Sequence, residues 1–170
     1  VGLALAQGVQ LAHFDIHGGY YEDPAIMEDV RRLVELRGRA LAEKDRTSVA
    51  EILAAVDEDS EHYFTFRHPI LTPLLSGQTA ELGFVGPYDV ALMTDLGRLD
   101  LRRYKLVVML NTVRVDDTQR RVVRERLARD GRTVVWLYAP GYVTDAGLSA
   151  DAMRELCGIR VAPDPKMTRG

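Results

Sequence analysis

The chain of 170 residues lacks most features that mark secreted, membrane-spanning or disulfide-bonded proteins. Its single cysteine, Cys157, excludes an internal disulfide framework and any cysteine-rich zinc site. Its longest apolar runs, such as 106–110 and 134–139, are far shorter than the about 20 residues that a transmembrane helix needs. No basic region precedes the apolar start, and no small-residue cleavage site follows it. We therefore expect no signal peptide and a soluble, cytoplasmic protein.

Neither sign of charge dominates the sequence. Lys and Arg number 22 against 25 Asp and Glu, and no block of like charge is long enough to form a basic groove. We therefore expect neither nucleic acid nor a membrane as a partner. A small or neutral partner fits this balance better.

The start of the chain is typical of a segment from a longer protein. The chain begins at Val1 rather than Met, and Val1–Gln7 resembles the last turns of an apolar helix, with Gly8 at the expected C-cap. At 170 residues the length suits one small domain together with a piece of another.

A short β-like run near the start ends in ionisable and aromatic residues. Alternation along a strand places His13, Asp15 and His17 on one face. These three side chains could bind a metal such as zinc or iron, although a further ligand from elsewhere is missing. They could instead bind a sugar together with the rings of Tyr20 and Tyr21, or form an ordinary polar strand end.

A helix and a polar linker follow this cluster. Pro24 at the first helical position predicts a helix over 24–42, with an apolar stripe along one side. The wholly polar stretch 43–48 is the best candidate for a linker, and we place a boundary near Asp45. We therefore expect two parts, 1–45 and 46–170.

Strands and helices alternate after the boundary. The strands are apolar on both faces, which predicts an α/β fold with a doubly wound parallel sheet in three layers, similar to flavodoxin-like and class I glutamine amidotransferase-like folds. We expect strands at 51–57, 89–94, 104–111, 133–139 and 159–162, and helices at 70–82, 116–129 and 149–156. In helix 116–129, Val122, Val123 and Leu127 should face inward, and the exposed side should carry Arg120, Arg121, Arg124, Glu125 and Arg126.

Polar residues follow the first and third predicted strands, where ligands bind in such sheets. Acids in the run Asp57-Glu58-Asp59-Ser60 suggest the magnesium site of receiver domains. That hypothesis fails because the third strand ends in Asn111, where an Asp is required. We expect Ser60 or Asp59 to cap the following turn instead.

The turn after the fourth strand lacks a nucleophile. Class I glutamine amidotransferases carry a reactive cysteine there, on a tight glycine-flanked turn. This chain has Tyr138-Ala139-Pro140-Gly141-Tyr142 at that point, and Cys157 falls on the last helix, where we expect it to be buried. We therefore assign no catalytic residue.

Several motifs together resemble one family. They are Phe14-Asp15, Gly18-Gly19-Tyr20-Tyr21, Val56–Ser60, Pro87–Val90, Tyr104–Leu106, Leu110-Asn111 and, most specifically, Asp130–Tyr142. With them the chain resembles the C-terminal portion of a β-galactosidase-type glycoside hydrolase, in which a (β/α)8 barrel is followed by an amidotransferase-like trimerisation domain.

The resemblance implies that 1–45 is the last strand and helix of the barrel and that 46–170 is the trimerisation domain without a nucleophile. Both catalytic glutamates would precede Val1, so the chain alone would be inactive. His13, Asp15, His17, Tyr20 and Tyr21 would then border the carbohydrate pocket. The resemblance also implies a homo-oligomer, a trimer, and no metal or other cofactor.

A second hypothesis stays open from the sequence. The chain could be a free-standing amidotransferase-like α/β module that binds a ligand or regulates a partner, with its first forty residues as an added helical arm. An independent amidase is a third possibility, and the missing nucleophile weighs against it.

Overall fold

The computed structural model describes residues 18–43, 45, 47–65 and 68–161. The chain divides into two compact units, Val1–Ser48 and Val49–Gly170.

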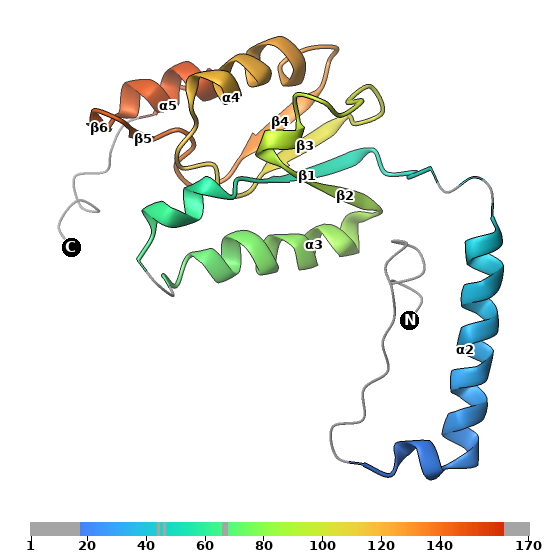
Figure 1. The fold of residues 1–170 in the computed structure, drawn as a ribbon. Coiled ribbons are helices and arrows are strands. Elements are labelled where there is room, and N and C mark those ends of the chain that lie inside the picture. The colour runs from blue at the N-terminus through green and yellow to red at the C-terminus, as the bar shows by residue number, and fades with distance from the viewer. Residues whose placement is uncertain (1–17, 44, 46, 66–67, 162–170) are drawn as a thin grey trace. The chain divides into compact units, whose positions relative to one another are not determined.

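The first unit contains a 3-10 turn and one long helix. The turn η1 (Tyr20–Glu22) leads into α2 (Pro24–Ala42), which has the predicted bounds (Figure 1). Asp23 is the N-cap, because its side chain accepts hydrogen bonds from the backbone N–H groups of Ala25 and Ile26. No residue of α2 is buried. In the part of the chain that the structure describes, no helix is both long enough and apolar enough to span a membrane.

The second unit is built on a four-stranded parallel sheet. Its strands are β1 (Ile52–Val56), β2 (Tyr88–Leu92), β3 (Leu106–Met109) and β4 (Thr133–Trp136), in the order β2-β1-β3-β4. Ala54 at the centre of β1 pairs with Val90 on one side and with Val108 on the other. The predicted α/β fold with a parallel sheet is therefore confirmed.

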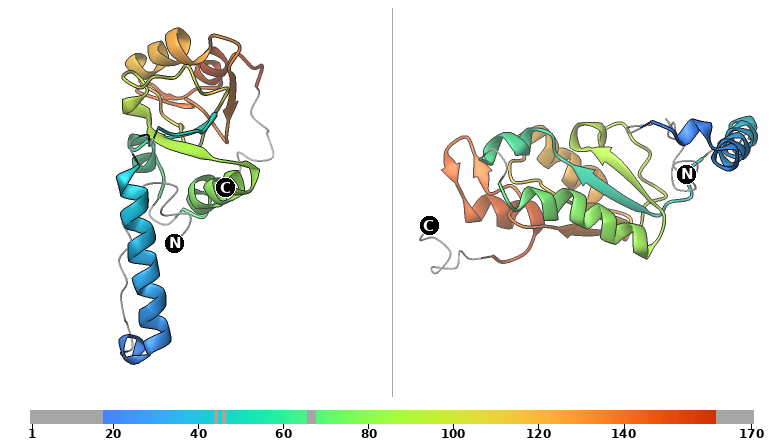
Figure 2. Two further views of the ribbon diagram at one scale, coloured as in Figure 1. Left: turned by 90° about the vertical axis from the view of Figure 1, so that its right-hand side faces the viewer. Right: turned by 90° about the horizontal axis from the view of Figure 1, so that it is seen from below.

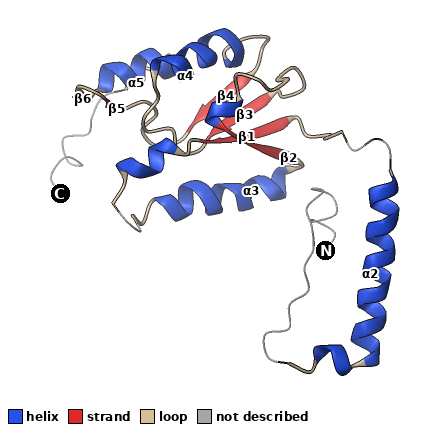
Figure 3. Ribbon diagram, in the orientation of Figure 1, coloured by secondary structure: helices blue, strands red, loops and turns tan. Residues whose placement is uncertain are grey.

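Helices cover both faces of this sheet and produce three layers (Figures 1 and 3). On one face lies the π-helical turn η3 (Pro73–Gly77), which continues directly into α3 (Gln78–Val85). Seen from below, α3 crosses in front of the strands (Figure 2, right). On the other face lie α4 (Asp117–Val122), its π-helical continuation η5 (Val123–Leu127), and α5 (Ala150–Cys157).

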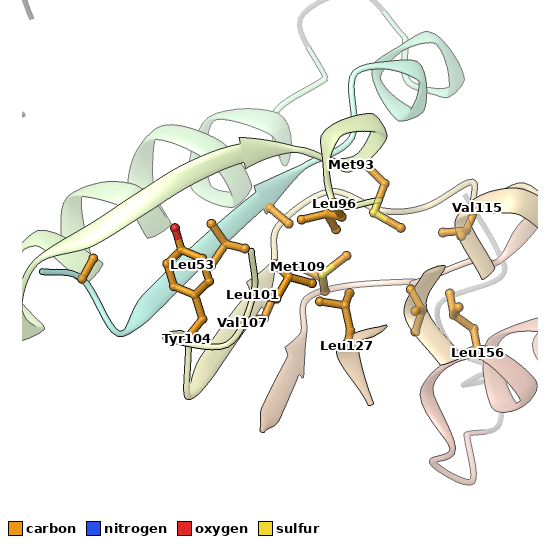
Figure 4. Packing of buried hydrophobic residues seen from close by; sticks show 13 residues of the cluster. Leu53, Met93, Leu96, Leu101, Tyr104, Val107, Met109, Val115, Leu127 and Leu156 are labelled. Carbon is orange, nitrogen blue, oxygen red and sulfur yellow. The ribbon is translucent and has the colours of Figure 1, made fainter. Parts of the chain in front are cut away.

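The larger part of the core lies between the sheet and α4, η5 and α5. Leu53, Val107 and Met109 of the central strands belong to this part of the core together with Leu127 and Leu156, and Figure 4 shows Leu53 near Tyr104 and Met109 near Leu127. The smaller core, on the α3 face, contains Ala54, Val108 and Leu110 as its buried residues. The alternation of these side chains along β1 and β3 explains why both strands are apolar on both faces.

Short connecting elements complete the fold. They are the 3-10 turns η2 (Asp59–Tyr63) and η4 (Met93–Asp95), and the hairpin strands β5 (Val143–Thr144) and β6 (Gly147–Leu148). The sequence did not predict this hairpin. The strand predicted at 159–162 is wrong for 159–161, which have no regular structure, and residue 162 lies outside the described residues.

The predicted inward and outward faces of the helix at 116–129 need two corrections. Val123 and Leu127 are buried as expected, but Arg126, predicted to be exposed, is half-buried and donates hydrogen bonds to the carbonyls of Leu96 and Leu99. Arg120, also predicted to be exposed, is buried. Its guanidinium donates hydrogen bonds to the backbone carbonyls of Val115, Gly141 and Ala152. These bonds replace the hydration that burial removes, so the arginine can lie inside without a carboxylate partner.

Candidate functional site

The carboxyl ends of β1 and β3 lie side by side at the point where the order of strands reverses. From β1 the chain crosses to β2 on one side and then to β3 on the other. The helix after β1 covers one face and the helix after β3 covers the other (Figure 1). In open α/β sheets this edge is the usual place for a ligand.

A buried carboxyl group, that of Asp57, lies at this edge immediately after β1. Its Oδ2 accepts a hydrogen bond from the Ser60 backbone N–H at 2.8 Å, and its Oδ1 accepts one from Nε2 of Gln119 at 2.9 Å. Burial raises the pKa of Asp57 above its ordinary value, and the hydrogen bonds from Ser60 and Gln119 offset part of that rise. The acid thus holds the turn after β1 against the start of α4.

This arrangement corrects the expectation that Ser60 or Asp59 caps the turn after β1. The cap is Asp57, because its carboxylate accepts from the Ser60 N–H. The Ser60 hydroxyl instead exchanges hydrogen bonds with the backbone of Arg114, at 3.0 Å to the N–H and 3.2 Å to the carbonyl. A serine that is fully buried and bonded in this way is part of the framework.

Two buried oxygen atoms near the strand ends have no hydrogen-bond partner among the described residues. They are Oε2 of Glu58 and Oγ1 of Thr112. The other oxygen of Glu58, Oε1, accepts from the Thr94 hydroxyl at 2.6 Å. Within the residues described, no group of three or more His, Cys, Asp or Glu is placed to hold a metal ion.

The turn after β4 contains two residues in the left-handed region of the backbone map. Tyr138 has φ +64° and Gly141 has φ +63°. A tyrosine in this region is strained by about 1 to 2 kcal/mol. Tyr138 is 56% exposed, and the centre of its ring lies 6.3 Å from the centre of the Phe64 ring. Between the two residues lie Ala139 and Pro140, which carry no nucleophilic group.

The lone cysteine lies away from the turn after β4. Cys157 ends α5, is half-buried rather than fully buried as predicted, and has its Sγ 3.8 Å from the Ile159 carbonyl.

A hollow of about 600 Å³ opens beside the start of α4. Its walls come from the loop after β3, from α4 and η5, from β5 and the residue after it, and from α5. The lining is mostly charged and consists of Arg114, Val115, Asp116, Asp117, Thr118, Arg120, Arg124, Val143, Thr144, Asp145, Ala152 and Glu155.

Two of the arginines that line the hollow are held firmly. Arg114 donates from Nη2 to Oδ1 of Asp145 at 2.8 Å, and its guanidinium carbon lies 5.7 Å from the centre of the Tyr63 ring. The hydrogen bond to Asp145 raises the pKa of Arg114, which therefore keeps its charge at any physiological pH. Arg120 is held by its three carbonyl partners.

The sequence-based site at the start of the chain is largely beyond what the structure describes. His13, Asp15 and His17 lie outside the described residues. Tyr20 and Tyr21 are the first two residues of the turn η1, and Tyr21 is 46% exposed. Whether these five residues form one site therefore stays a prediction.

Sequence reasoning missed the residues that build the hollow. Arg114 and Asp145 are 31 positions apart and meet only because β5 returns to the loop after β3. The capping pair Asp116 and Gln119 did carry a local signal, since an acid followed three residues later by Gln is a capping box.

Comparisons with known proteins found little similarity. No protein-family model matches the chain, and no curated protein matches it. Among solved structures the chain is distantly similar to a β-galactosidase from Bifidobacterium adolescentis, with a TM-score of 0.45 and 18% sequence identity. The similarity covers 65% of this chain and 55% of that chain.

Proposed function

We propose that this chain is a non-catalytic segment of a carbohydrate-cleaving enzyme of the β-galactosidase type. In this proposal the first unit borders the sugar pocket and the second unit supports assembly of a homo-oligomer, a trimer. The catalytic carboxylates would belong to a part of the enzyme that precedes Val1.

The turn after β4 carries this proposal. The most specific motif of the resemblance, Asp130–Tyr142, includes all of β4 and this turn. Tyr138 in this turn has a left-handed φ of +64°, and neither it nor Ala139 and Pro140 offers the cysteine that an amidotransferase needs. An amidotransferase-like domain without its nucleophile is best explained as a packing or assembly module.

Exposed apolar side chains on the second unit support a role in assembly. Phe84 and Val85 at the end of α3 are 87% and 72% exposed, and Val90 on the neighbouring edge strand β2 is 57% exposed. Apolar side chains that gather on a surface commonly mark contacts between proteins.

The enzymatic part of the proposal is tested with two proteins. The full-length enzyme should hydrolyse at least one member of a panel of aryl glycosides, and this chain alone should hydrolyse none. Turnover by the chain alone would refute the assignment of both carboxylates to preceding sequence. Glutamine hydrolysis that Cys157→Ala abolishes would revive the amidase hypothesis.

A free-standing amidotransferase-like ligand-binding or regulatory module is the second candidate. The missing nucleophile is equally compatible with it. The reading frame before Val1 discriminates between the two, because a complete barrel needs about 250 residues. A start codon directly before Val1 would exclude the glycosidase hypothesis.

The assembly part has its own test. Phe84→Glu should shift the protein toward the monomer in light scattering, because a charge would be buried in the contact. Leu148→Glu is the matched control, since Leu148 is 69% exposed on the separate strand β6. If Phe84→Glu leaves the oligomer intact, the contact does not involve the end of α3.

A further inference from the structure

Several charged side chains that line the hollow beside α4 have no hydrogen bond or ion pair with the described residues. Its volume of about 600 Å³ lies in the range of small-molecule sites, about 300 to 1,000 Å³. Nothing in the proposed function above requires it.

The side chains around the hollow offer both donors and acceptors. Among the described residues, the side chains of Asp117, Arg124 and Glu155 have no hydrogen bond or ion pair. Arg114 has five N–H donors and uses one of them on Asp145. Asp117 and Arg124 come from α4 and η5, and Glu155 comes from α5. A ligand between these helices would therefore meet cationic donors and anionic acceptors together.

The charges of the walls nearly cancel. Arg114 and Asp145 neutralise each other, which leaves Arg120 and Arg124 against Asp116, Asp117 and Glu155. The two arginines and three carboxylates leave a net charge of −1, which disfavours a phosphate or another multivalent anion. An apolar ligand would strip water from charged groups without replacing its hydrogen bonds. A molecule with many hydroxyl groups avoids both costs, because each hydroxyl can donate to a carboxylate and accept from an arginine.

The walls of the hollow are rigid at their base. Arg120 is 8% exposed, and its three carbonyl partners come from the loop after β3, the turn after β4 and α5. Arg114 is held through its backbone by the buried Ser60, and its side chain pairs with the exposed Asp145. Residues at the bottom of the hollow that are already ordered lose little further conformational entropy when a ligand binds.

We propose that this hollow binds a small, neutral, polyhydroxylated molecule, with Arg114 and Arg124 as donors and Asp117 and Glu155 as acceptors. The ligand class follows from the balance of donors and acceptors and does not depend on any relation to glycoside hydrolases. The ligand could be a ring sugar or an open-chain polyol, which share this chemistry.

The test is an NMR titration of the complete 170-residue chain with four probes. Glucose and sorbitol represent the ring and open-chain forms, while inorganic phosphate and glutamine represent an anion and a zwitterion. We expect glucose or sorbitol to shift the backbone amide signals of Arg114, Thr118 and Thr144. The neutral probe that binds more tightly shows whether the ligand is a ring sugar or an open-chain polyol. A response to phosphate or glutamine without one to the neutral probes would overturn the proposal, as would the absence of any response.

Variants test whether the neutral probe binds in the hollow. Glu155→Gln and Arg124→Gln should each weaken binding of the neutral probe by about tenfold, because each replaces a charged hydrogen-bonding group by a neutral one, which forms weaker hydrogen bonds. Glu125→Gln and Arg121→Gln are controls with the same changes of charge, at exposed positions of α4 and η5 that do not line the hollow. All four residues are exposed, so the variants should fold. Equal weakening in variants and controls, or none in either, would contradict the assignment.

Discussion

The side chain of Asn111 bonds both backbone groups of Asp57. Its Oδ1 accepts from the Asp57 N–H at 2.8 Å, and its Nδ2 donates to the Asp57 carbonyl at 2.8 Å. Both residues are fully buried at the carboxyl ends of adjacent strands. The amide therefore continues the pairing of β1 and β3 past the last backbone bond of the sheet.

Removal of this amide should destabilise the second unit. Asn111→Ala leaves a buried N–H and a buried carbonyl without partners, which should lower the free energy of unfolding by about 3 kcal/mol. Urea denaturation followed by circular dichroism measures the loss. Arg98→Ala, at an exposed position, should change stability by less than about 0.5 kcal/mol. Equal midpoints for the two variants would contradict the role of Asn111.

The Asp57 carboxyl should make stability depend on pH. Its folded-state pKa is raised, chiefly by burial, so the folded protein holds the proton more tightly than the unfolded chain. This contribution is full below the unfolded pKa of about 3.9 and is lost as the pH rises through the higher folded pKa. Ionised Asp57 has no cationic partner in a hydrogen bond or ion pair among the described residues.

Asp57→Asn isolates this contribution, because the other carboxyl groups titrate in both proteins. The free energy of unfolding of the wild type, relative to that of Asp57→Asn, should fall as the pH rises from acid toward neutrality. Urea denaturation at a series of pH values measures the difference. A difference that stays constant with pH would show that Asp57 has an ordinary pKa in the folded protein.

Arg120 should not tolerate replacement by lysine. A lysine ammonium is compact and cannot reach three carbonyls that a planar guanidinium bonds at once. Arg120→Lys should therefore lower the free energy of unfolding by about 2 kcal/mol. The neighbouring exposed arginine provides the control, and Arg121→Lys should be nearly neutral. Thermal unfolding of both variants distinguishes them, and similar melting temperatures would refute the structural role of Arg120.

Gly141 should be more sensitive to substitution than Gly131. Both have left-handed φ angles, +63° and +69°. A Cβ at Gly141 would lie 2.7 Å from Cδ2 of Leu156 and 2.9 Å from Nη2 of Arg120, whereas a Cβ at Gly131 would have no atom within 4 Å. Gly131→Ala should therefore cost about 1 kcal/mol through backbone strain alone.

Gly141→Ala adds steric overlap with two buried side chains, so its total cost should reach about 3 kcal/mol. Chemical denaturation of the two variants side by side measures the difference. If Gly141→Ala were no more harmful than Gly131→Ala, Leu156 and Arg120 would have to move aside freely.

Local signals in the sequence predicted the helices well. Pro24 and Asp23 marked the start of α2, and Ser149 and Gly158 marked the two ends of α5. Ser149 accepts from the Ala152 N–H, and Gly158 has the left-handed φ of a C-cap. Such caps depend on residues within one turn of each other, which is why the sequence alone reveals them.

Hydrogen bonds between residues distant in the sequence could not be predicted from local signals. Arg120 lies in a helix whose pattern predicted an exposed side chain, yet its partners include Gly141 and Ala152, which are 21 and 32 positions away. The hairpin of β5 and β6 was missed because two strands of two residues each carry no periodic signal.

The sequence by itself determined the class of fold. Strands apolar on both faces, separated by helices, must bury both faces, and a parallel sheet between helical layers does so. The absence of a cysteine or serine from the turn after β4 was also evident from residue types alone. Only the tertiary structure decided the order β2-β1-β3-β4, the bonding of Asp57 by Gln119 and Asn111, and the gathering of Arg114, Arg124 and Glu155 around one hollow. The physical reason is that burial pattern and capping are local properties, whereas the partners of buried polar groups depend on which distant segments the fold brings together.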